Sequence, residues 1–438
     1  MRHASPAVRR AAARALGSSV AEDAREPALS ALREAASTEG DGRARASMIE
    51  ALAKIGGARV ASELDELYPT PSGAGARSAG VERARLAAKR DAIRETPSSL
   101  REDATLDRAD VVYRCRRGLE SILTEELRAR GLSDARPEGP SGLVRATYSG
   151  PFGAVLEART ALSVAFPLAP LDPSLEDAPA LVRALTAPAS LSLVTHLTHG
   201  PARFRLELPR GKRRALVWEV AASLDGAPIV NDPRASTWVA TVRELGRGAR
   251  VEWSPRLPDE RFAYRVADVP AASHPTLAAA LVRVSEPRGD DVVWDPFIGS
   301  GLELCERHLF GSCRALIGTD VDDAALDRSR SNLASVGAIA DLFRATAMAF
   351  RPDTPLSVIL TNPPMGRRVL EGHDIAGMLG AFVRRAPEVL GPRGRLVWLS
   401  PVPGATREAA RAAGLRLTRS SDVDMGGFSA ELQRFDLP

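Results

Sequence analysis

The sequence has 438 residues, which is too many for one ordinary hydrophobic core, so we expect two or three domains. A hydrophobic content of 44% and a charged content of 26% indicate a soluble globular protein. The sequence contains no run of about 18 apolar residues, which excludes an ordinary membrane-spanning helix, and the net charge of +4 by itself indicates no partner.

The three cysteines, Cys115, Cys305 and Cys313, are odd in number and form no paired metal-ligand pattern. They argue against a disulfide framework and against a zinc site, and they fit a reducing compartment. We therefore expect a cytoplasmic protein without a bound metal ion.

Residues 1–95 are rich in alanine and arginine and have apolar positions at helical spacing. The segment AVRRAAARALG recurs in looser form as RARASMIEALAKIGG, and a third helix, VERARLAAKRDAI, follows the turn-rich stretch PTPSGAGARSAG. A period of about 40 residues is typical of HEAT-type repeats. We expect a short helical repeat that docks to a protein partner, and the alternative is an alanine-rich helical extension with no binding role.

Residues 96–110 are polar and unpatterned, which indicates a linker. In residues 111–258 the expected strands are VVYRC, GLVRATYS, ARFRLELP and TWVATVREL, and the expected helices are GLESILTEEL, FGAVLEARTAL and APALVRAL. This mixture predicts an α+β domain. Residues 200–265 hold 13 Lys and Arg against 8 Asp and Glu. Such an excess suits a phosphate backbone, although a solvated basic face has the same composition.

Residues 262–438 alternate between strand and helix signals. The expected strands are DVVWD, RALIGTD, DLFRATA, LSVILT and RLVWLS, followed by LRLTRS and ELQRFDL with no helix between these last two. The expected helices begin at Ser300, Asp322, Ile375 and Thr406. The alternation predicts a Rossmann-like parallel sheet with helices on both faces, and the last two strands predict an antiparallel pair at its edge.

The first of these strands runs into the glycine-rich turn DPFIGSG. Gly299 and Gly301 permit a tight turn close to a ligand, and the helix start after them offers free N–H groups. Asp320 ends the next strand, 19 residues after Gly301, where a carboxylate can accept both hydroxyls of a ribose. Asp295 ends the first strand, in position to meet an amino group of the same ligand. Capping of the following helix is the alternative role for either aspartate.

The strand LSVILT is followed directly by Asn362, Pro363 and Pro364. Two prolines cannot continue a strand, so they stiffen the turn and leave the Asn362 side chain and the Pro363 carbonyl pointing outward. These two oxygens can accept both hydrogens of an exocyclic amine and so direct its lone pair at an electrophilic methyl group. The alternative is a plain β-turn.

The order and spacing of DPFIGSG, GTD and NPPMG resemble the amino-methyltransferases of the Asn-Pro-Pro-Tyr type. The stretch ASHPTLAAALVR narrows this resemblance to the THUMP-containing RNA guanine N2-methyltransferases, which modify tRNA or 23S ribosomal RNA. The segments IVNDPRASTWVATVR and RLPDERFAYR are similar to the ferredoxin-like plus THUMP portion of that family. The resemblance covers about residues 108–438 and leaves out the helical N-terminal region.

The resemblance implies an α/β fold class. A Rossmann-like seven-stranded methyltransferase domain would occupy residues 262–438, after an α+β THUMP-like RNA-binding domain over 111–258 and the HEAT-like region 1–95. It implies transfer of a methyl group from S-adenosyl-L-methionine to the N2 amine of a guanine in structured RNA. The implied cofactor contacts are Thr276, Asp295, Phe297, Gly299, Ser300, Gly301, Asp320 and Thr346. The implied catalytic residues are Asn362, Pro363, Pro364 and Met365, and the implied RNA contacts are Arg367, Arg368, Lys212, Arg213 and Arg214.

Three residues depart from the pattern of this family. Leu302 stands where a threonine is usual, Thr346 where an acidic residue lies near the adenine, and Met365 where an aromatic residue follows the prolines. Aromatic stacking on a base is worth about 1–3 kcal/mol, and a methionine sulfur on a ring about 0.3–1.5 kcal/mol. The alternative functions are an amino-methyltransferase acting on DNA adenine or protein glutamine, and a non-catalytic RNA-binding or assembly protein that retains the fold.

Overall fold

The structure, a computed structural model, describes residues 2–67, 79–171, 177–209, 213–244, 248–269, 274–366 and 374–438. Its internal contacts divide the chain into two compact units. Unit 1 consists of residues 1–104 and 167–257, and unit 2 of residues 105–166 and 258–438. Each unit is therefore built from two stretches of sequence, and the division falls inside residues 111–258.

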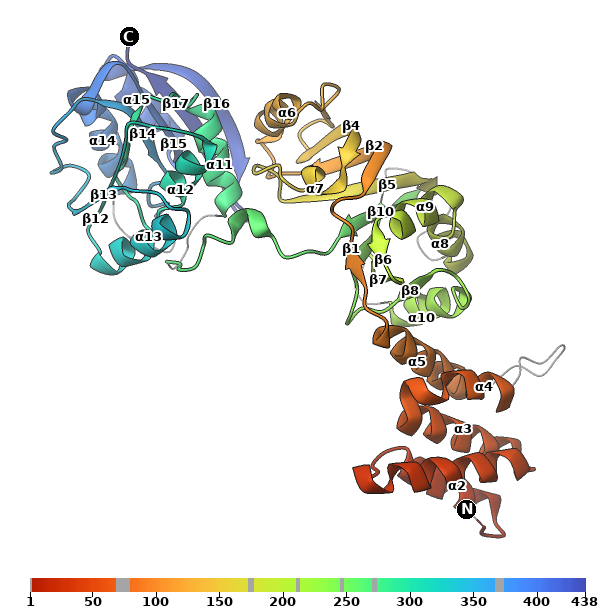
Figure 1. Cartoon of the computed structure of the whole chain (residues 1–438). Coiled ribbons are helices and arrows are strands. Elements are labelled where there is room, and N and C mark those ends of the chain that lie inside the picture. Colours follow the sequence, from red (N-terminus) through yellow and green to blue (C-terminus); the bar gives the residue numbers. More distant parts are fainter. Residues whose placement is uncertain are drawn as a thin grey trace. The chain divides into compact units, whose positions relative to one another are not determined.

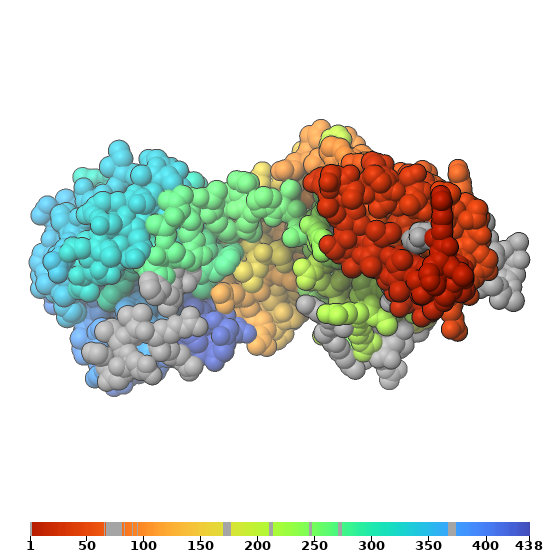
Figure 2. Space-filling model, turned by 90° about the horizontal axis from the view of Figure 1, so that it is seen from below, coloured from red at the N-terminus to blue at the C-terminus, as the bar shows by residue number. Residues whose placement is uncertain are grey.

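Unit 1 begins with a region of stacked helices (Figure 1, red to orange), whose surface is coloured red in Figure 2. These are α1 (Pro6–Leu16), η1 (Glu22–Ala24), α2 (Arg25–Thr38), α3 (Gly42–Gly56), η2 (Gly57–Val60), α4 (Ala61–Leu67) and α5 (Ala79–Glu95). The helices α1, α2 and α5 all pack against α3. Buried alanines such as Ala13, Ala36 and Ala44 leave room for this close approach, and the helices expected in residues 1–95 are confirmed.

The rest of unit 1 is a small mixed sheet with helices. Its elements are β1 (Ser99–Leu100), α8 (Ala178–Leu185), α9 (Pro188–His196), β6 (Thr198–His199), β7 (Ala202–Glu207), α10 (Arg214–Ser223), β8 (Ile229–Asn231), β9 (Trp238–Glu244) and β10 (Ala249–Pro255). The strand β7 runs parallel to β8 and β9, while β9 and β10 are antiparallel. In the described ranges no single helix is long and apolar enough to cross a membrane, and only the pair α8 and α9, bent by 54°, meets that test together.

The helical region is fixed to the rest of unit 1 through α5. The guanidinium of Arg85 on α5 donates to the Asp225 carboxylate at 2.6 Å, and only 5% of the Arg85 side chain is exposed. Arg203 on β7 donates to the carbonyls of Ile93 and Thr96 at the end of α5. These buried contacts join the helical repeat to the small sheet within one unit.

The first stretch of unit 2 forms a small antiparallel sheet. It contains β2 (Thr105–Arg114), α6 (Glu120–Ala129), β3 (Arg136–Pro137), β4 (Leu143–Pro151), α7 (Phe152–Val155) and the start of β5 (Ser163–Leu171). Part of the segment 96–110, which the sequence indicates as a linker, lies in β1 and β2, where Leu100 and Leu106 are buried. The helix expected over FGAVLEARTAL is wrong beyond Val155. Glu126 accepts the backbone N–H groups of Arg159 and Thr160, which fixes that segment as a loop.

The second stretch of unit 2 is a seven-stranded sheet in the order β13-β12-β11-β14-β15-β17-β16 (Figure 1). Its strands are β11 (Val292–Asp295), β12 (Ala315–Asp320), β13 (Asp341–Arg344), β14 (Leu356–Thr361), β15 (Leu390–Ser400), β16 (Arg416–Asp424) and β17 (Ser429–Asp436). The strands β11 to β15 are parallel, and β17 is antiparallel to its neighbours β15 and β16. The Rossmann-like α/β fold and its closing antiparallel pair are therefore confirmed.

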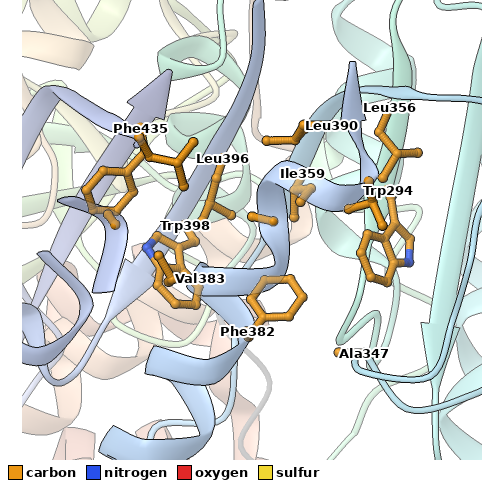
Figure 3. Close-up of a cluster of buried hydrophobic side chains, with 14 of the residues drawn as sticks. Trp294, Ala347, Leu356, Ile359, Phe382, Val383, Leu390, Leu396, Trp398 and Phe435 are labelled. Carbon is orange, nitrogen blue, oxygen red and sulfur yellow. The ribbon is translucent and has the colours of Figure 1, made fainter. Parts of the chain in front are cut away.

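The helices of this stretch are α11 (Pro275–Val284), α12 (Leu302–Phe310), α13 (Asp323–Ser335), α14 (Ile375–Val389) and α15 (Pro403–Ala412), after the short helix η3 (Glu260–Phe262). One core lies between α14, α15 and the sheet, where Trp294, Phe382 and Trp398 are buried in a row with ring centroids 6.0 Å apart (Figure 3). Burying one large apolar side chain contributes about 1.5–3 kcal/mol, so this core stabilises the packing of α14 against the sheet.

Candidate functional site

The predicted residues that follow the parallel strands lie at one edge of the seven-stranded sheet. Asp295 ends β11, Asp320 ends β12 and Thr361 ends β14, and these three strands are parallel neighbours in the order β12-β11-β14. Because the carboxyl ends of parallel strands meet at the same edge, the loops that follow them converge there.

The glycine-rich turn after β11 is held in a left-handed backbone conformation. Gly299 and Gly301 have φ values of 52° and 77°. A Cβ at Gly301 would approach the Ser329 side chain on α13 to 3.0 Å, so the turn has no room for a larger residue. The backbone N–H of Ile298 donates to the Thr319 carbonyl at 3.0 Å, which pins the turn to β12. The helix α12 then begins at Leu302, two residues later than the start expected at Ser300.

Asp295 is completely buried and is tied to the end of β14. Its Oδ1 accepts a hydrogen bond from the Thr361 hydroxyl at 2.6 Å and another from the Phe297 N–H at 3.1 Å. Its Oδ2 has no hydrogen-bond partner. Burial raises the pKa of Asp295 to about 7, against the opposing effect of these two hydrogen bonds.

Asp320 is half-buried and binds the glycine-rich turn from the next strand. Its Oδ2 accepts the N–H of Gly299 at 3.0 Å, and its Oδ1 accepts the N–H of Asp322 at 3.0 Å. Each carboxylate oxygen has a second lone pair, so both can accept a further hydrogen bond from a ligand hydroxyl. The aspartate thus combines a structural contact with a free binding capacity.

The segment after β14 leaves the sheet at Asn362. Asn362, Pro364 and Met365 are half-buried, whereas Pro363 is buried. Gly366 closes the turn with a φ of 73°, and a Cβ there would meet the Ile375 side chain at 2.6 Å. The prolines therefore end the strand as expected, and the Asn362 amide lies directly beyond the residue that binds Asp295.

A strap formed by residues 264–269 is fixed to the glycine-rich turn by Asn332 of α13. The buried Asn332 amide accepts the N–H of Ala267 at 2.9 Å and donates to the carbonyls of Ala267 and Ser300, both at 2.8 Å. The Ser335 hydroxyl donates to the Tyr264 carbonyl at 2.8 Å. One side chain thus joins the strap, α13 and the turn.

Thr276 lies in the first turn of α11 and is completely buried. Its hydroxyl lies 3.0 Å from Nδ1 of His274, which caps the same helix. Burial lowers the pKa of His274, so the imidazole is neutral at physiological pH. The threonine hydroxyl is therefore already hydrogen-bonded within its own helix cap.

Thr346 follows β13, which ends at Arg344, and its side chain is exposed. Its hydroxyl accepts the N–H of Ala349 at 3.1 Å. Arg213 and Arg214 belong to unit 1, at the beginning of α10. The other predicted RNA contacts, Lys212, Arg367 and Arg368, lie outside the described residues.

The structure also reveals a buried acid that the sequence reasoning missed. Glu303, in the first turn of α12, is 6% exposed, and its Oε1 has no hydrogen-bond partner. Burial, followed by repulsion from Asp295, raises the pKa of Glu303 to about 8. The sequence does hold one indication that Glu303 is buried. It lies between Leu302 and Leu304, and an acid between two buried leucines indicates that the start of the helix is covered on several sides.

Comparisons with known proteins agree with this geometry. Residues 263–431 match the family described as RMKL-like, methyltransferase domain, and residues 1–84 match HEAT repeats. The solved structure of TrmN from Thermus thermophilus superposes with a TM-score of 0.62 at 24% identity and covers 75% of this chain and 99% of that one. SMU.472, solved as a complex with SAH, gives a TM-score of 0.60 at 16% identity and covers 75% and 98%. These two likenesses show a shared fold.

Two curated relatives are similar in sequence. A tRNA (guanine(6)-N2)-methyltransferase from Thermus thermophilus is 32% identical over 158 residues, which are 35% of this chain and 46% of the relative. A tRNA (guanine(10)-N2)-dimethyltransferase from Methanothermobacter thermautotrophicus is 34% identical over 99 residues, 22% and 29% of the two chains. The chain thus spans less than half the length of either relative. Residues 263–431 are therefore similar to the RMKL-like methyltransferase domain, and residues 1–84 are similar to HEAT repeats.

Proposed function

We propose that this chain is an S-adenosylmethionine-dependent methyltransferase that acts on the exocyclic N2 amine of a guanine in structured RNA, either tRNA or 23S ribosomal RNA. One observation carries the proposal. The turn at Asn362 and Pro363 follows Thr361, whose hydroxyl donates to Asp295 beside the glycine-rich turn. The turn proposed to hold the amine and the turn proposed to hold the cofactor are thereby joined by one hydrogen bond.

The residues at this edge fit the cofactor. The left-handed glycines leave the backbone close to a ligand, and a Cβ at Gly301 would contact Ser329. Asp320 offers a carboxylate to the ribose, and the buried Asp295 Oδ2 is an acceptor that lacks a partner. When bound there, the cofactor supplies an electrophilic methyl group.

The chain itself contributes positioning. The Asn362 amide oxygen and the Pro363 carbonyl accept the two N–H groups of the target amine, which aims its lone pair at the methyl group. Met365, half-buried in the same turn, contacts the face of the flipped base through its sulfur. None of these residues acts as a strong base. The rate of methyl transfer therefore depends on how accurately the turn positions the amine.

We assign RNA binding to residues 111–258 and catalysis to residues 262–438. The basic excess of residues 200–265, including Lys212, Arg213 and Arg214, would neutralise phosphates, and Arg367 and Arg368 would contact the RNA beside the target base. Two tRNA guanine N2-methyltransferases among the relatives support RNA as the substrate. We assign partner docking to residues 1–95, and the three unpaired cysteines support a cytoplasmic location.

The variant Asn362→Ala tests the proposal. It should abolish methylation while leaving RNA binding nearly intact, because it removes an acceptor for the amine and leaves the basic residues in place. Mass spectrometry of nucleosides from separated tRNA and ribosomal RNA measures N2-methylguanosine in a deletion strain complemented with either gene. An equal loss of RNA binding and methylation would contradict the role given to Asn362.

The same measurements separate the alternatives. Unchanged N2-methylguanosine together with a loss of DNA N6-methyladenine or of methylated protein glutamine in the deletion strain would favour those substrates. Thr346 stands where the family has an acidic residue, and Met365 where it has an aromatic one. These two differences favour a non-catalytic protein that retained the fold. Calorimetry that finds no binding at millimolar S-adenosylmethionine would support that alternative.

A further inference from the structure

The loop after α7 brings an arginine to the helix that follows the glycine-rich turn. Arg159 donates from Nε and Nη2 to the two carboxylate oxygens of Glu306 on α12, at 2.7 and 2.8 Å. The Glu306 side chain is only 1% exposed, and a buried carboxylate is costly without a charged partner. A bidentate pair also fixes the orientation of both groups. The first stretch of unit 2 thus neutralises and orients an acid of α12.

The backbone of Arg159 is held in place by its own stretch of chain. Its N–H and that of Thr160 donate to the completely buried Glu126 on α6, at 2.8 and 2.9 Å. Glu126 also accepts from Arg283 on α11 at 2.8 Å. The Arg159 side chain therefore projects from a loop that is fixed by other groups, and a substitution of this side chain leaves those backbone hydrogen bonds in place.

Glu306 also binds the first residue of the strap formed by residues 264–269. The buried Tyr264 hydroxyl donates to Glu306 Oε1 at 2.6 Å. Burial, followed by the charge of Glu306, raises the pKa of Tyr264 far above its ordinary value, so the hydroxyl remains a donor at physiological pH. Arg159 in addition donates to the Arg261 carbonyl, shortly before the strap, at 2.7 Å. The ion pair therefore fixes the beginning of the strap.

The other end of the strap lies against the glycine-rich turn. Asn332 binds both backbone groups of Ala267 in the middle of the strap. A Cβ at Gly299 would lie 3.7 Å from Cγ2 of Val269, the last residue of the strap. A continuous series of contacts therefore leads from Arg159 to the glycine-rich turn.

We infer that Arg159 is a positioning residue of the methyl-transfer site, which holds the glycine-rich turn and the strap in the arrangement that binds S-adenosylmethionine. This inference rests on the proposed function. Arg159 acts through Glu306 and not on the reacting atoms. It lies outside residues 263–431, the part that matches the methyltransferase domain, so a residue more than 100 positions before that domain completes the site.

Arg159→Met in the full chain tests the inference, because it keeps the length of the side chain and removes its N–H donors. The KM for S-adenosylmethionine should rise by about tenfold or more, whereas kcat and the KM for RNA from the deletion strain should change by less than about threefold. Calorimetry without RNA should show the same loss of affinity for S-adenosylmethionine. A pair that only stabilises the fold would lower the melting temperature and leave this affinity unchanged.

Two further variants separate positioning from stability. Arg159→Lys keeps the charge but loses the planar set of donors that binds both oxygens of Glu306. It should recover most of the melting temperature and less than half of the lost affinity. Arg85→Met is the matched control, because Arg85 on α5 of unit 1 is also a buried arginine, bound to Asp225 at 2.6 Å. It should lower the melting temperature and leave the KM for S-adenosylmethionine unchanged.

An Arg159→Met protein that binds S-adenosylmethionine with the affinity of the parent would overturn the inference. If this variant does not fold, Tyr264→Phe decides the question. It removes one hydroxyl, leaves the ion pair intact and should weaken S-adenosylmethionine binding at least about threefold. Unchanged affinity of Tyr264→Phe would likewise overturn the inference.

Failure of the proposed function gives a different result. A parent protein that binds no S-adenosylmethionine contradicts the proposed function, whereas parental affinity in the variants removes only the role of Arg159. Hydrogen exchange of residues 264–269 measures the positioning without any ligand, and it should be faster in Arg159→Met and in Tyr264→Phe than in Arg85→Met. Equal exchange in all three variants would contradict the positioning itself.

Discussion

Met365 has a half-buried side chain in the turn that holds Asn362, at the position where the family it resembles has an aromatic ring. A thioether is flexible and contacts a ring through one atom, whereas an aromatic residue covers the whole face of a base at little cost in conformational entropy. Under the proposed function, a substitution at this position would change the support of the base and leave the capture of the amine by Asn362 in place.

Met365→Tyr should raise the turnover number by up to about tenfold, because stacking on the base is worth about 1–3 kcal/mol against about 0.3–1.5 kcal/mol for a sulfur contact. Single-turnover methylation of RNA from the deletion strain measures this rate. Met425→Tyr, at a half-buried methionine in the turn between β16 and β17, is the control. A slower Met365→Tyr enzyme would show that the pocket is shaped around methionine.

At the scale of single residues, the sequence predicts the location of those site residues that directly end or follow a strand. Asp295, Asp320 and Asn362 lie where the ends of β11, β12 and β14 require them. Asn332 was not predictable, because it acts on Ala267, 65 residues earlier in the chain. Glu303 was missed because its effect depends on burial from several sides, which local spacing does not report.

At the scale of elements, the strap of residues 264–269 depends on a single side chain of α13. Asn332 satisfies both backbone groups of Ala267 and the carbonyl of Ser300. The Asn332 amide both donates to and accepts from the backbone of Ala267, as a neighbouring strand would. The strap is therefore held beside the glycine-rich turn although it is not a strand of the sheet. The order of the strap and the order of the turn are therefore coupled.

Asn332→Ala should weaken this coupling. Three hydrogen bonds are lost and buried backbone groups are left unsatisfied, at about 1–3 kcal/mol each, so the KM for S-adenosylmethionine should rise by about tenfold or more while kcat changes less. Hydrogen exchange of residues 264–269 should accelerate at the same time. Ser331→Ala, which removes only a bond to the Asp327 carbonyl on the exposed side of α13, is the control. Unchanged exchange in the strap would contradict this account.

Element types were easier to predict from the sequence than element ends. The strand expected over DLFRATA stops at Arg344, and the residues after it form a turn closed by the Thr346 hydroxyl. The expected helix after Pro151 stops at Val155, and Glu126 from α6 accepts the backbone N–H groups of Arg159 and Thr160 in the loop that follows. The second of these ends depends on tertiary hydrogen bonds, which a local pattern does not contain, whereas the first is set by a local side-chain hydrogen bond.

At the scale of the whole molecule, each unit is assembled from two separate stretches of chain. In unit 2, the loop before α6 lies against β16. The Ser421 hydroxyl donates to the Gly118 carbonyl, and Arg117 donates to the Asp424 carboxylate at 2.8 Å. The sequence predicts one continuous domain over 111–258 because neighbouring segments share a mixed pattern, and such a pattern carries no information about partners 300 residues away.

Gly118→Ala should disrupt the joint that the loop before α6 forms with β16. Gly118 has a φ of 93°, and a Cβ there would lie 1.8 Å from the Asp422 carbonyl oxygen. Gly131→Ala is the matched control, because its φ is 94° and nothing lies within 4 Å of its Cβ position. Both variants bear the cost of a left-handed alanine, about 1–3 kcal/mol, so Gly118→Ala should unfold at least about 5 °C below Gly131→Ala. Equal melting temperatures would show that the joint does not contribute to stability.

The joint between Arg117 and Asp424 also determines the order of events during synthesis, because its partners are 307 residues apart. At about 5–20 residues per second, the ribosome needs roughly 15–60 s to make the second partner after the first. During that interval residues 167–257 emerge and can fold, while the earlier stretch of unit 2 waits with its docking surface open. A nascent chain interrupted before β16 would therefore be a substrate for chaperones and proteases, because unit 2 would still lack β16 and β17.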